Sequence, residues 1–324
     1  MGPCKSIEAT IEAALRASAR HVQRTPAGDW RLTVANGTAF DVRARIADGE
    51  WLEMTARSPK ASAPRGTAPP WSLLCLNARL TGYTRLATRP GGDTELRAEL
   101  FVGASTGEPV DGERPLETDV AALCENLRRA HCETRALGST TGCPLSPWPD
   151  PTEGGADEIA RLCAEAGWSA TSHASGEVTV PLAGRADGFD VCLTFDGRSR
   201  LRAVVPVTAG PVASGASRAA LASLLLEVSS AVRMVKGVVF RRGDVDVAGI
   251  AMADECPAPS PAAIDRALAA LAVACGLAGR EAQVLQDDAL ARSYLALRHP
   301  SWEQVDLVGH RATEMEDTPC QRLP

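Results

Sequence analysis

Two regions of the chain show the period-two alternation of apolar and polar residues that is typical of half-buried β-strands. The first region is divided by the turn-forming pairs Asn36-Gly37 and Asp48-Gly49, and the second by Asp187-Gly188 and Asp196-Gly197. We therefore expect two three-stranded antiparallel meanders. Their inward-facing residues are Trp30, Leu32, Val34, Phe40, Val42, Ala44, Ile46, Leu52, Met54 and Ala56 in the first, and Val178, Val180, Leu182, Phe189, Val191, Leu193, Phe195, Leu201, Ala203, Val205 and Val207 in the second.

Apolar residues at helical spacing surround both meanders. They predict helices over 5–20, 71–80 and 217–235, one that opens at Pro115, one capped by Asp157, one that follows Ser260-Pro261, and a last one over 280–298. The helix over 217–235 is the longest expected, and Gly237 is read as its stop. Hairpins are expected over 83–102 and 238–251.

The same pattern is read twice. Phe40-Asp41-Val42 reappears as Phe189-Asp190-Val191, and each copy opens a strand after a tight turn. Helix, three-strand meander, helix, hairpin and helix follow one another in both halves, at a distance of about 150 residues, which is an ordinary domain size. The fold class predicted is α+β, a tandem duplication of an α-β-β-β-α-β-β-α domain with antiparallel sheets.

The composition of connecting segments sets the predicted boundaries. A first domain is expected over 1–135, a linker rich in Pro, Gly, Ser and Thr over 136–156, a second domain over 157–299 and a C-terminal tail over 300–324. The stretch after Arg280 has no counterpart in the first half.

Charge and hydropathy narrow the function classes. A formal net charge of −6 argues against a nucleic-acid-binding protein, because neutralising phosphates requires a basic face. No uninterrupted apolar run approaches the roughly 20 residues that span a bilayer, and the first 20 residues lack the apolar stretch of a signal peptide. We therefore expect a cytoplasmic protein with no membrane partner.

Ten cysteines could suggest disulfides, but their positions favour burial. Cys124, Cys163 and Cys275 each fall on the apolar stripe of an expected helix, where cysteine acts as a small hydrophobe. The chain has no Cys-x-x-Cys pair, and disulfide scaffolds are typical of short secreted chains.

The order of elements and the four turns resemble the type III secretion chaperone fold and the related YbjN-like bacterial proteins, over residues 5–134 and 157–278. The resemblance implies a cytoplasmic, non-enzymatic protein without cofactors that dimerises through its middle helix and holds an extended polypeptide segment against apolar patches. Two covalent copies would then form an internal pseudo-dimer, with residues 71–80 and 217–235 as the mating helices, in a monomer or a homodimer of such chains.

Catalytic and metal-binding alternatives rest on two places. His173 lies between Ser172 and Ser175, so a hydrolytic Ser/His pair is conceivable, although no nucleophile elbow surrounds it. Cys124, His131, Cys132 and Cys143 have side chains that suit zinc, but their spacing is poor for a zinc site and packing in the core is the competing interpretation. No glycine-rich nucleotide-binding pattern occurs.

Trp51 is the one candidate partner-binding residue. It lies on the polar face of its strand, opposite Leu52 and Met54, where an aromatic side chain can anchor a partner. The alternative is that another part of the same chain covers it. The function predicted is non-catalytic polypeptide binding; a metal-binding or hydrolytic enzyme that uses the Cys124–Cys143 cluster or His173 is the alternative.

Overall fold

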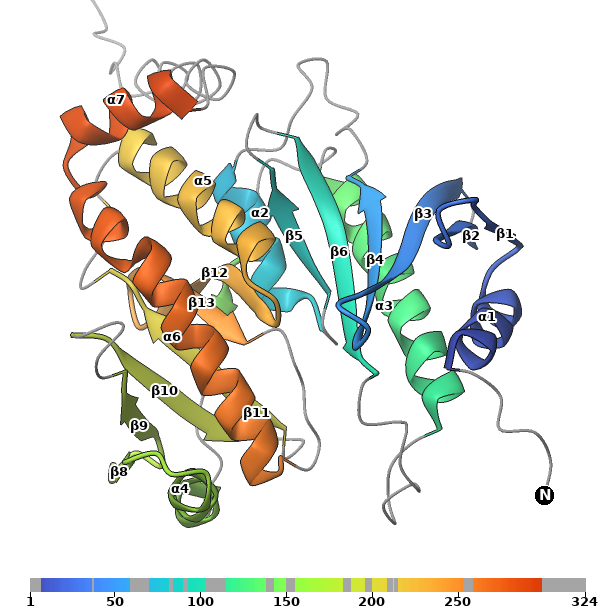
Figure 1. The fold of residues 1–324 in the computed structure, drawn as a ribbon. Coiled ribbons are helices and arrows are strands. Elements are labelled where there is room, and N and C mark those ends of the chain that lie inside the picture. The colour runs from blue at the N-terminus through green and yellow to red at the C-terminus, as the bar shows by residue number, and fades with distance from the viewer. Residues whose placement is uncertain are drawn as a thin grey trace, which may run out of the picture.

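The computed structural model describes residues 7–298 except 37, 59–69, 82–83, 90–92, 103–114, 138–142, 150–154, 183–187, 196–199, 209–211, 213–214 and 253–258. Within these residues the protein has an α+β fold with two sheets and seven helices (Figure 1). One continuous apolar core runs through both halves of the chain.

The first sheet is antiparallel, with six strands in the order β1-β2-β3-β4-β6-β5. Its strands are β1 (His21–Arg24), β2 (Trp30–Asn36), β3 (Thr38–Ala47), β4 (Trp51–Arg57), β5 (Thr84–Thr88) and β6 (Thr94–Phe101). The second sheet is mixed, with seven strands in the order β7-β12-β13-β11-β10-β9-β8. Its strands are β7 (Ser146–Pro147), β8 (Thr171–Ser172), β9 (Val178–Pro181), β10 (Asp190–Phe195), β11 (Leu201–Pro206), β12 (Val235–Arg242) and β13 (Val245–Met252).

The two sheets share one topology once β7 is set aside. Reading each from the same end, the order is a short strand, three meander strands, then the second and the first strand of the hairpin. The short strands β1 and β8 were not predicted from the sequence; each extends its meander by one strand. β7 is the single parallel addition and pairs with the edge of β12.

The seven helices cover the two sheets, lie between them or pack on another helix (Figure 1). α1 (Ile7–Ser18) packs with α3 (Leu116–Leu137), which covers the first sheet, and α4 (Gly155–Glu165) packs with α6 (Pro261–Val284) on the second. α2 (Pro70–Arg79) and α5 (Gly215–Ala231) lie where the halves meet, and α7 (Asp288–Arg298) packs on α5.

Local sequence explains several element ends. Asp48 and Gly49 both have positive φ angles, 52° and 73°, which is the backbone that a tight hairpin turn between right-twisted strands requires, and β3 pairs with β4 across it as expected. Ser260 caps α6 by accepting a hydrogen bond from the Ala263 N–H at 3.2 Å, and Pro261 occupies the first turn. Asp157, by contrast, lies inside α4, which begins at Gly155.

The prediction of a longest helix over 217–235 is wrong. α5 ends at Ala231 and is shorter than α3 and α6. Met234 adopts a left-handed φ of 64°, which turns the chain, and Val235 already begins β12. Gly237 does not stop a helix; it lies in β12 so close to α5 that an added Cβ would be 2.6 Å from the Leu225 Cβ. The last predicted helix is also divided differently, because α6 runs to Val284 and α7 starts at Asp288.

α6 is long and apolar enough to cross a membrane by length and composition alone. The sequence analysis did not predict this, because the apolar stretch of α6 is interrupted by charged residues. Half of its most apolar 18-residue window is buried inside the protein. The predicted tail 300–324 lies outside the described residues, as do Asp187 and the predicted turn Asp196-Gly197, whereas Gly188 is described and has a φ of 89°.

Candidate functional site

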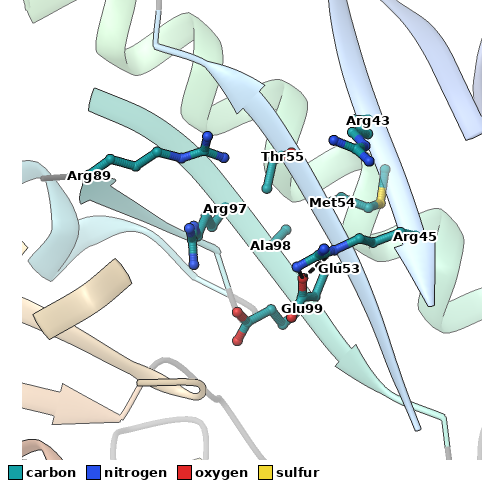
Figure 2. A pocket seen from close by; sticks show the side chains of 9 residues that line it. All are labelled: Arg43, Arg45, Glu53, Met54, Thr55, Arg89, Arg97, Ala98 and Glu99. Atoms are coloured by element: carbon teal, nitrogen blue, oxygen red, sulfur yellow. Dashed lines mark hydrogen bonds and ion pairs between the residues drawn. The ribbon is translucent and has the colours of Figure 1, made fainter. Parts of the chain in front are cut away.

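The outer face of the first sheet, which looks away from α3, carries a line of arginines (Figure 2). Residues paired directly across neighbouring strands form this line: Arg31 of β2, Arg43 of β3, Thr55 of β4, Arg97 of β6 and Arg85 of β5. We refer to it as the arginine row. Like charges that face each other across strands destabilise a sheet, so the row needs compensating charge.

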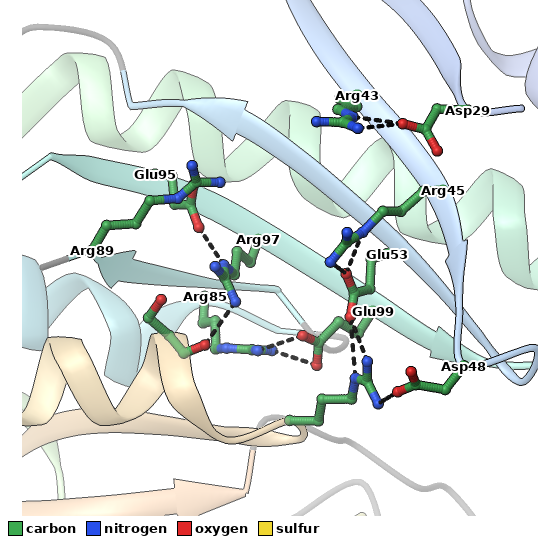
Figure 3. Close-up of polar contacts among 12 residues, drawn as sticks. Asp29, Arg43, Arg45, Asp48, Glu53, Arg85, Arg89, Glu95, Arg97 and Glu99 are labelled. Carbon is green, nitrogen blue, oxygen red and sulfur yellow. Dashed lines mark hydrogen bonds and ion pairs between the residues drawn. The ribbon is translucent and has the colours of Figure 1, made fainter. Parts of the chain in front are cut away.

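Carboxylates beside the row supply that compensation within the protein (Figure 3). The ion pairs are Arg43 with Asp29, Arg45 with Glu53, and both Arg89 and Arg97 with Glu95. Burial alone would raise the pKa of Glu53, but hydrogen bonds from Arg45 and from Arg233 of the second half outweigh it, and the net pKa is lowered. Glu53 is therefore ionised at neutral pH.

In three of these pairs the carboxylate is covered while the guanidinium is exposed. The side-chain exposures are 62% for Arg43 against 15% for Asp29, 52% for Arg45 against 12% for Glu53, and 58% for Arg89 against 10% for Glu95. A guanidinium has five N–H donors, so bonds to one carboxylate leave donors that can reach a ligand. The face consequently presents positive charge outward although its pairs are balanced.

A hollow of about 240 Å³ opens at the middle of the arginine row. Thr55, with its small side chain, lies between Arg43 and Arg97 in the row. The side chains of Arg43, Arg45, Arg89 and Arg97 surround the space in Figure 2, and the carboxylates of Glu53 and Glu99 lie at one end. The hollow can accept a small anionic group between guanidinium groups.

The second half of the chain holds the inner end of the row in place. Arg85 is buried with Glu99, and two hydrogen bonds of 2.5 and 2.8 Å join them. The Arg85 Nε also donates to the Ser229 carbonyl at the end of α5, at 2.6 Å. Arg97 donates from Nη1 to the Ser230 carbonyl at 2.7 Å. Cations at these carbonyls compensate the negative end of α5.

The same contact occurs in reverse across the two halves. Lys236 of β12, at the strand position that Arg85 has in β5, donates to the carbonyl of Leu80, directly after α2, at 2.5 Å. Burial, together with the charges of Arg202 and Arg85, lowers the pKa of Lys236 to about 7. Each hairpin thus contributes a basic side chain to the helix end of the other half.

The predicted partner-binding residue Trp51 lies at one end of the same outer face. Its ring is half-buried and packs edge-on against Phe101, with ring centroids 5.1 Å apart. The guanidinium of Arg233 lies 5.7 Å from the Trp51 ring centroid and also binds Glu53 and Asp48. The same chain therefore covers part of Trp51, and the remaining surface of the ring adjoins the charged face.

The outer face of the second sheet is covered by the chain itself. Trp148, directly after β7, is buried in an apolar cluster with Val204, Phe240 and others. Its ring packs edge-on against Phe240, and the guanidinium of Arg242 lies 4.7 Å from its centroid. The backbone N–H of Trp148 donates to the Arg241 carbonyl at 2.7 Å. Residues 146–148 are thus an extended segment docked along the edge and over the face of a sheet.

The other predicted site residues do not come together as a metal centre in the part of the chain that the structure describes. No group of three or more His, Cys, Asp or Glu side chains there is placed to hold a metal ion. Cys124 is buried, and His131 is buried with its ring stacked on Phe40 at 3.9 Å. His173 is exposed, and its Nε2 lies 2.9 Å from the Thr179 hydroxyl.

The arginine row was missed by the sequence analysis. Its members were visible only as polar positions that alternate with core residues in five expected strands, three in the first meander and two in the hairpin over 83–102. Their alignment depends on the pairing of β4 with β6, which are separated in the chain by α2 and β5. Arginine at outward positions of several neighbouring strands is the signal that could have indicated the row.

No family model, curated protein or solved structure was found to match this chain.

Proposed function

We propose that this chain is a non-catalytic cytoplasmic protein that binds a polypeptide segment, in the manner of the secretion chaperones that its element order resembles. The observation that carries the proposal is the docked segment 146–148, since it is an extended peptide held on the outer face of the second sheet. Strand addition to a sheet edge, with an aromatic side chain in an apolar site, is a common mode of peptide recognition.

The arrangement of the halves supports an internal pseudo-dimer produced by duplication. Both sheets follow the same strand order, α2 packs on β12 and on α5, and α5 packs on β5. Arg85 and Lys236 each bind a carbonyl at the end of a helix of the other half, as expected for two halves related by a pseudo-twofold axis. On this proposal the first sheet retains an open outer face, and a partner segment binds there with Trp51 at the end of its site.

The test starts from the tagged full chain purified from its native host, with bound polypeptides quantified by mass spectrometry and the complex then rebuilt from the two purified proteins. We expect one polypeptide in near-equal amount. Trp51→Ala should weaken the rebuilt complex about ten-fold or more, because truncating an aromatic anchor typically costs about 2 kcal/mol.

Trp168→Ala is the matched control, since Trp168 is also half-buried but bonds to Asp265 in the second half. It should leave the affinity unchanged. Recovery of the chain with no stoichiometric polypeptide would contradict the proposed function, whereas equal affinity of Trp51→Ala and the unchanged chain would remove Trp51 alone from the contact.

A further inference from the structure

We propose that the hollow at the arginine row binds the carboxylates of an acidic, extended polypeptide segment. The inference rests on the proposed function, which it extends by naming the chemistry of the partner. It does not require a new fold element, because the guanidinium groups of Arg43, Arg45 and Arg89 already stand outward around the space.

The outer faces of the two sheets are equivalent in position. In the second sheet, the residues paired across neighbouring strands in the row that contains Lys236 are Ala251, Val204, Cys192 and Thr179. Lys236 and Arg85 occupy the same strand position and make the same exchanged contact, so this row corresponds to the arginine row.

The row of the second sheet is covered by the chain, whereas the arginine row is hollowed. In the second sheet, Ala251, Val204 and Cys192 are buried in the cluster that contains Trp148. Phe240, which packs on Trp148, lies four residues after Lys236, and Arg89, which lines the hollow, lies four residues after Arg85. The hollow is therefore at the place that a docked segment of the chain fills on the other sheet.

The charge of the arginine row is complementary to that of a carboxylate. Where the second sheet offers apolar side chains to an indole, the first offers guanidinium groups, for which a carboxylate is the fitting partner because two parallel N–H donors match its two oxygens. The carboxylates paired with these arginines, on Asp29, Glu53 and Glu95, are largely covered, as their low exposures show, and the exposed Asp41 of β3 is not among the residues that line the hollow. An incoming acidic side chain consequently meets the arginines first.

The spacing of the arginines fits the spacing of side chains along an extended segment. Alternate side chains of an extended segment repeat about every 6.8 Å, and Arg43 and Arg97 lie two strands apart, about 9.6 Å. Glutamates at positions i and i+2 span that separation within the reach of their side chains. A nucleic acid fits less well, since single-strand binding uses aromatic platforms for the bases, and the two aromatic rings on this face, Trp51 and Phe101, pack on each other.

The experiment measures the fluorescence anisotropy of a labelled decapeptide of alternating glutamate and threonine with the full chain at about 50 mM NaCl, where screening is weak. We expect saturable binding that weakens about five-fold or more at about 300 mM NaCl. The same peptide with glutamine in place of glutamate should bind at least about ten-fold more weakly, because charge-assisted bonds are about twice as strong as neutral ones.

Two arginine variants make the test specific. Arg43→Gln should weaken binding of the glutamate peptide about five-fold, in line with the loss of one charge-assisted hydrogen bond. Arg161→Gln is the matched control, because Arg161 is comparably exposed and also paired with a glutamate, but lies on α4. The Arg161→Gln variant should bind the glutamate peptide as tightly as the unchanged chain does.

Three results would overturn the inference: equal binding of the glutamate and glutamine peptides, equal loss in both arginine variants, or tighter binding of an oligothymidylate of the same length. A chain that sediments as a dimer and becomes monomeric on Arg43→Glu would also overturn it, because a second copy would then be the occupant. If a native partner binds stoichiometrically while the glutamate peptide does not, the inference fails and the proposed function stands.

Discussion

Replacing Arg85 by methionine should lower the free energy of unfolding by about 3–5 kcal/mol, because it leaves the carboxylate of Glu99 buried without its cation. Both side chains are almost completely inaccessible, with exposures of 1% and 2%. The Met234 N–H also donates to Glu99, at 3.3 Å, but one amide does not replace a guanidinium. Chemical denaturation at neutral pH measures the change.

The double variant Arg85→Met with Glu99→Leu separates the two explanations for such a loss. Replacing a buried ion pair by apolar residues of similar volume is often nearly neutral, so most of the stability should return. Arg16→Met is the surface control: the exposed Arg16 pairs with Glu12 one turn away on α1, and the change should cost less than about 1 kcal/mol. A double variant as unstable as the single one would show that the contact with Ser229, rather than the uncompensated charge, dominates.

Buried hydrogen bonds of Asn77 join the two halves of the chain. The Asn77 side-chain amide donates to the carbonyls of both Leu86 and Gly237, one in each half, at 3.0 Å. Its carbonyl accepts from the Leu86 N–H at 2.7 Å. Because buried polar groups are costly when unpaired, these contacts require one relative placement of β5, β12 and α2.

Sequence reasoning was most successful where turn chemistry and alternation agree. The strands β3 and β4 follow from their period-two pattern and from Asp48-Gly49, and Trp30 is in the core as predicted. Cys124, Cys163 and Cys275 are buried, as their helical spacing indicated. All of these features depend on residues close in the chain.

The errors have a common physical reason. Val232 and Val235 continue the helical spacing of Leu221, Leu225 and Val228, so periodicity does not mark the end of α5, which depends on the backbone of Met234. β7 consists of two residues whose pairing with β12 is decided by tertiary contacts of Trp148. The arginine row likewise exists only once distant strands pair.

Alkaline pH should destabilise this protein strongly, because five of the cysteines that the structure describes are buried as thiols. Burial is the largest cause in each: it raises the pKa from 9.0 to about 11 for Cys124 and Cys163, and to about 12 for Cys75, Cys192 and Cys275. In the unfolded chain these thiols ionise near pH 9. Above that pH the folded state binds more protons than the unfolded state, so stability falls as pH rises.

The size of the loss follows from the number of protons. Each thiol contributes a loss of about 1.4 kcal/mol by pH 10, and five together exceed half of a typical domain's stability. Lys236 acts in the opposite direction, since its pKa is lowered from 10.5 to about 7 and the stability that it contributes rises between those values. One proton does not offset five, and the stability maximum should lie below about pH 9.

Urea denaturation at pH 8 and pH 10 tests this expectation, with Cys275→Ala as the informative variant. It should be slightly less stable than the unchanged chain at pH 8, because a buried sulfur is lost, but its decrease between the two pH values should be smaller by about 1.4 kcal/mol. Cys132→Ala is the control, since Cys132 is exposed, and its decrease should match that of the unchanged chain. An identical decrease in all three proteins would mean that buried thiols do not govern alkaline stability, and that the fold opens before they ionise.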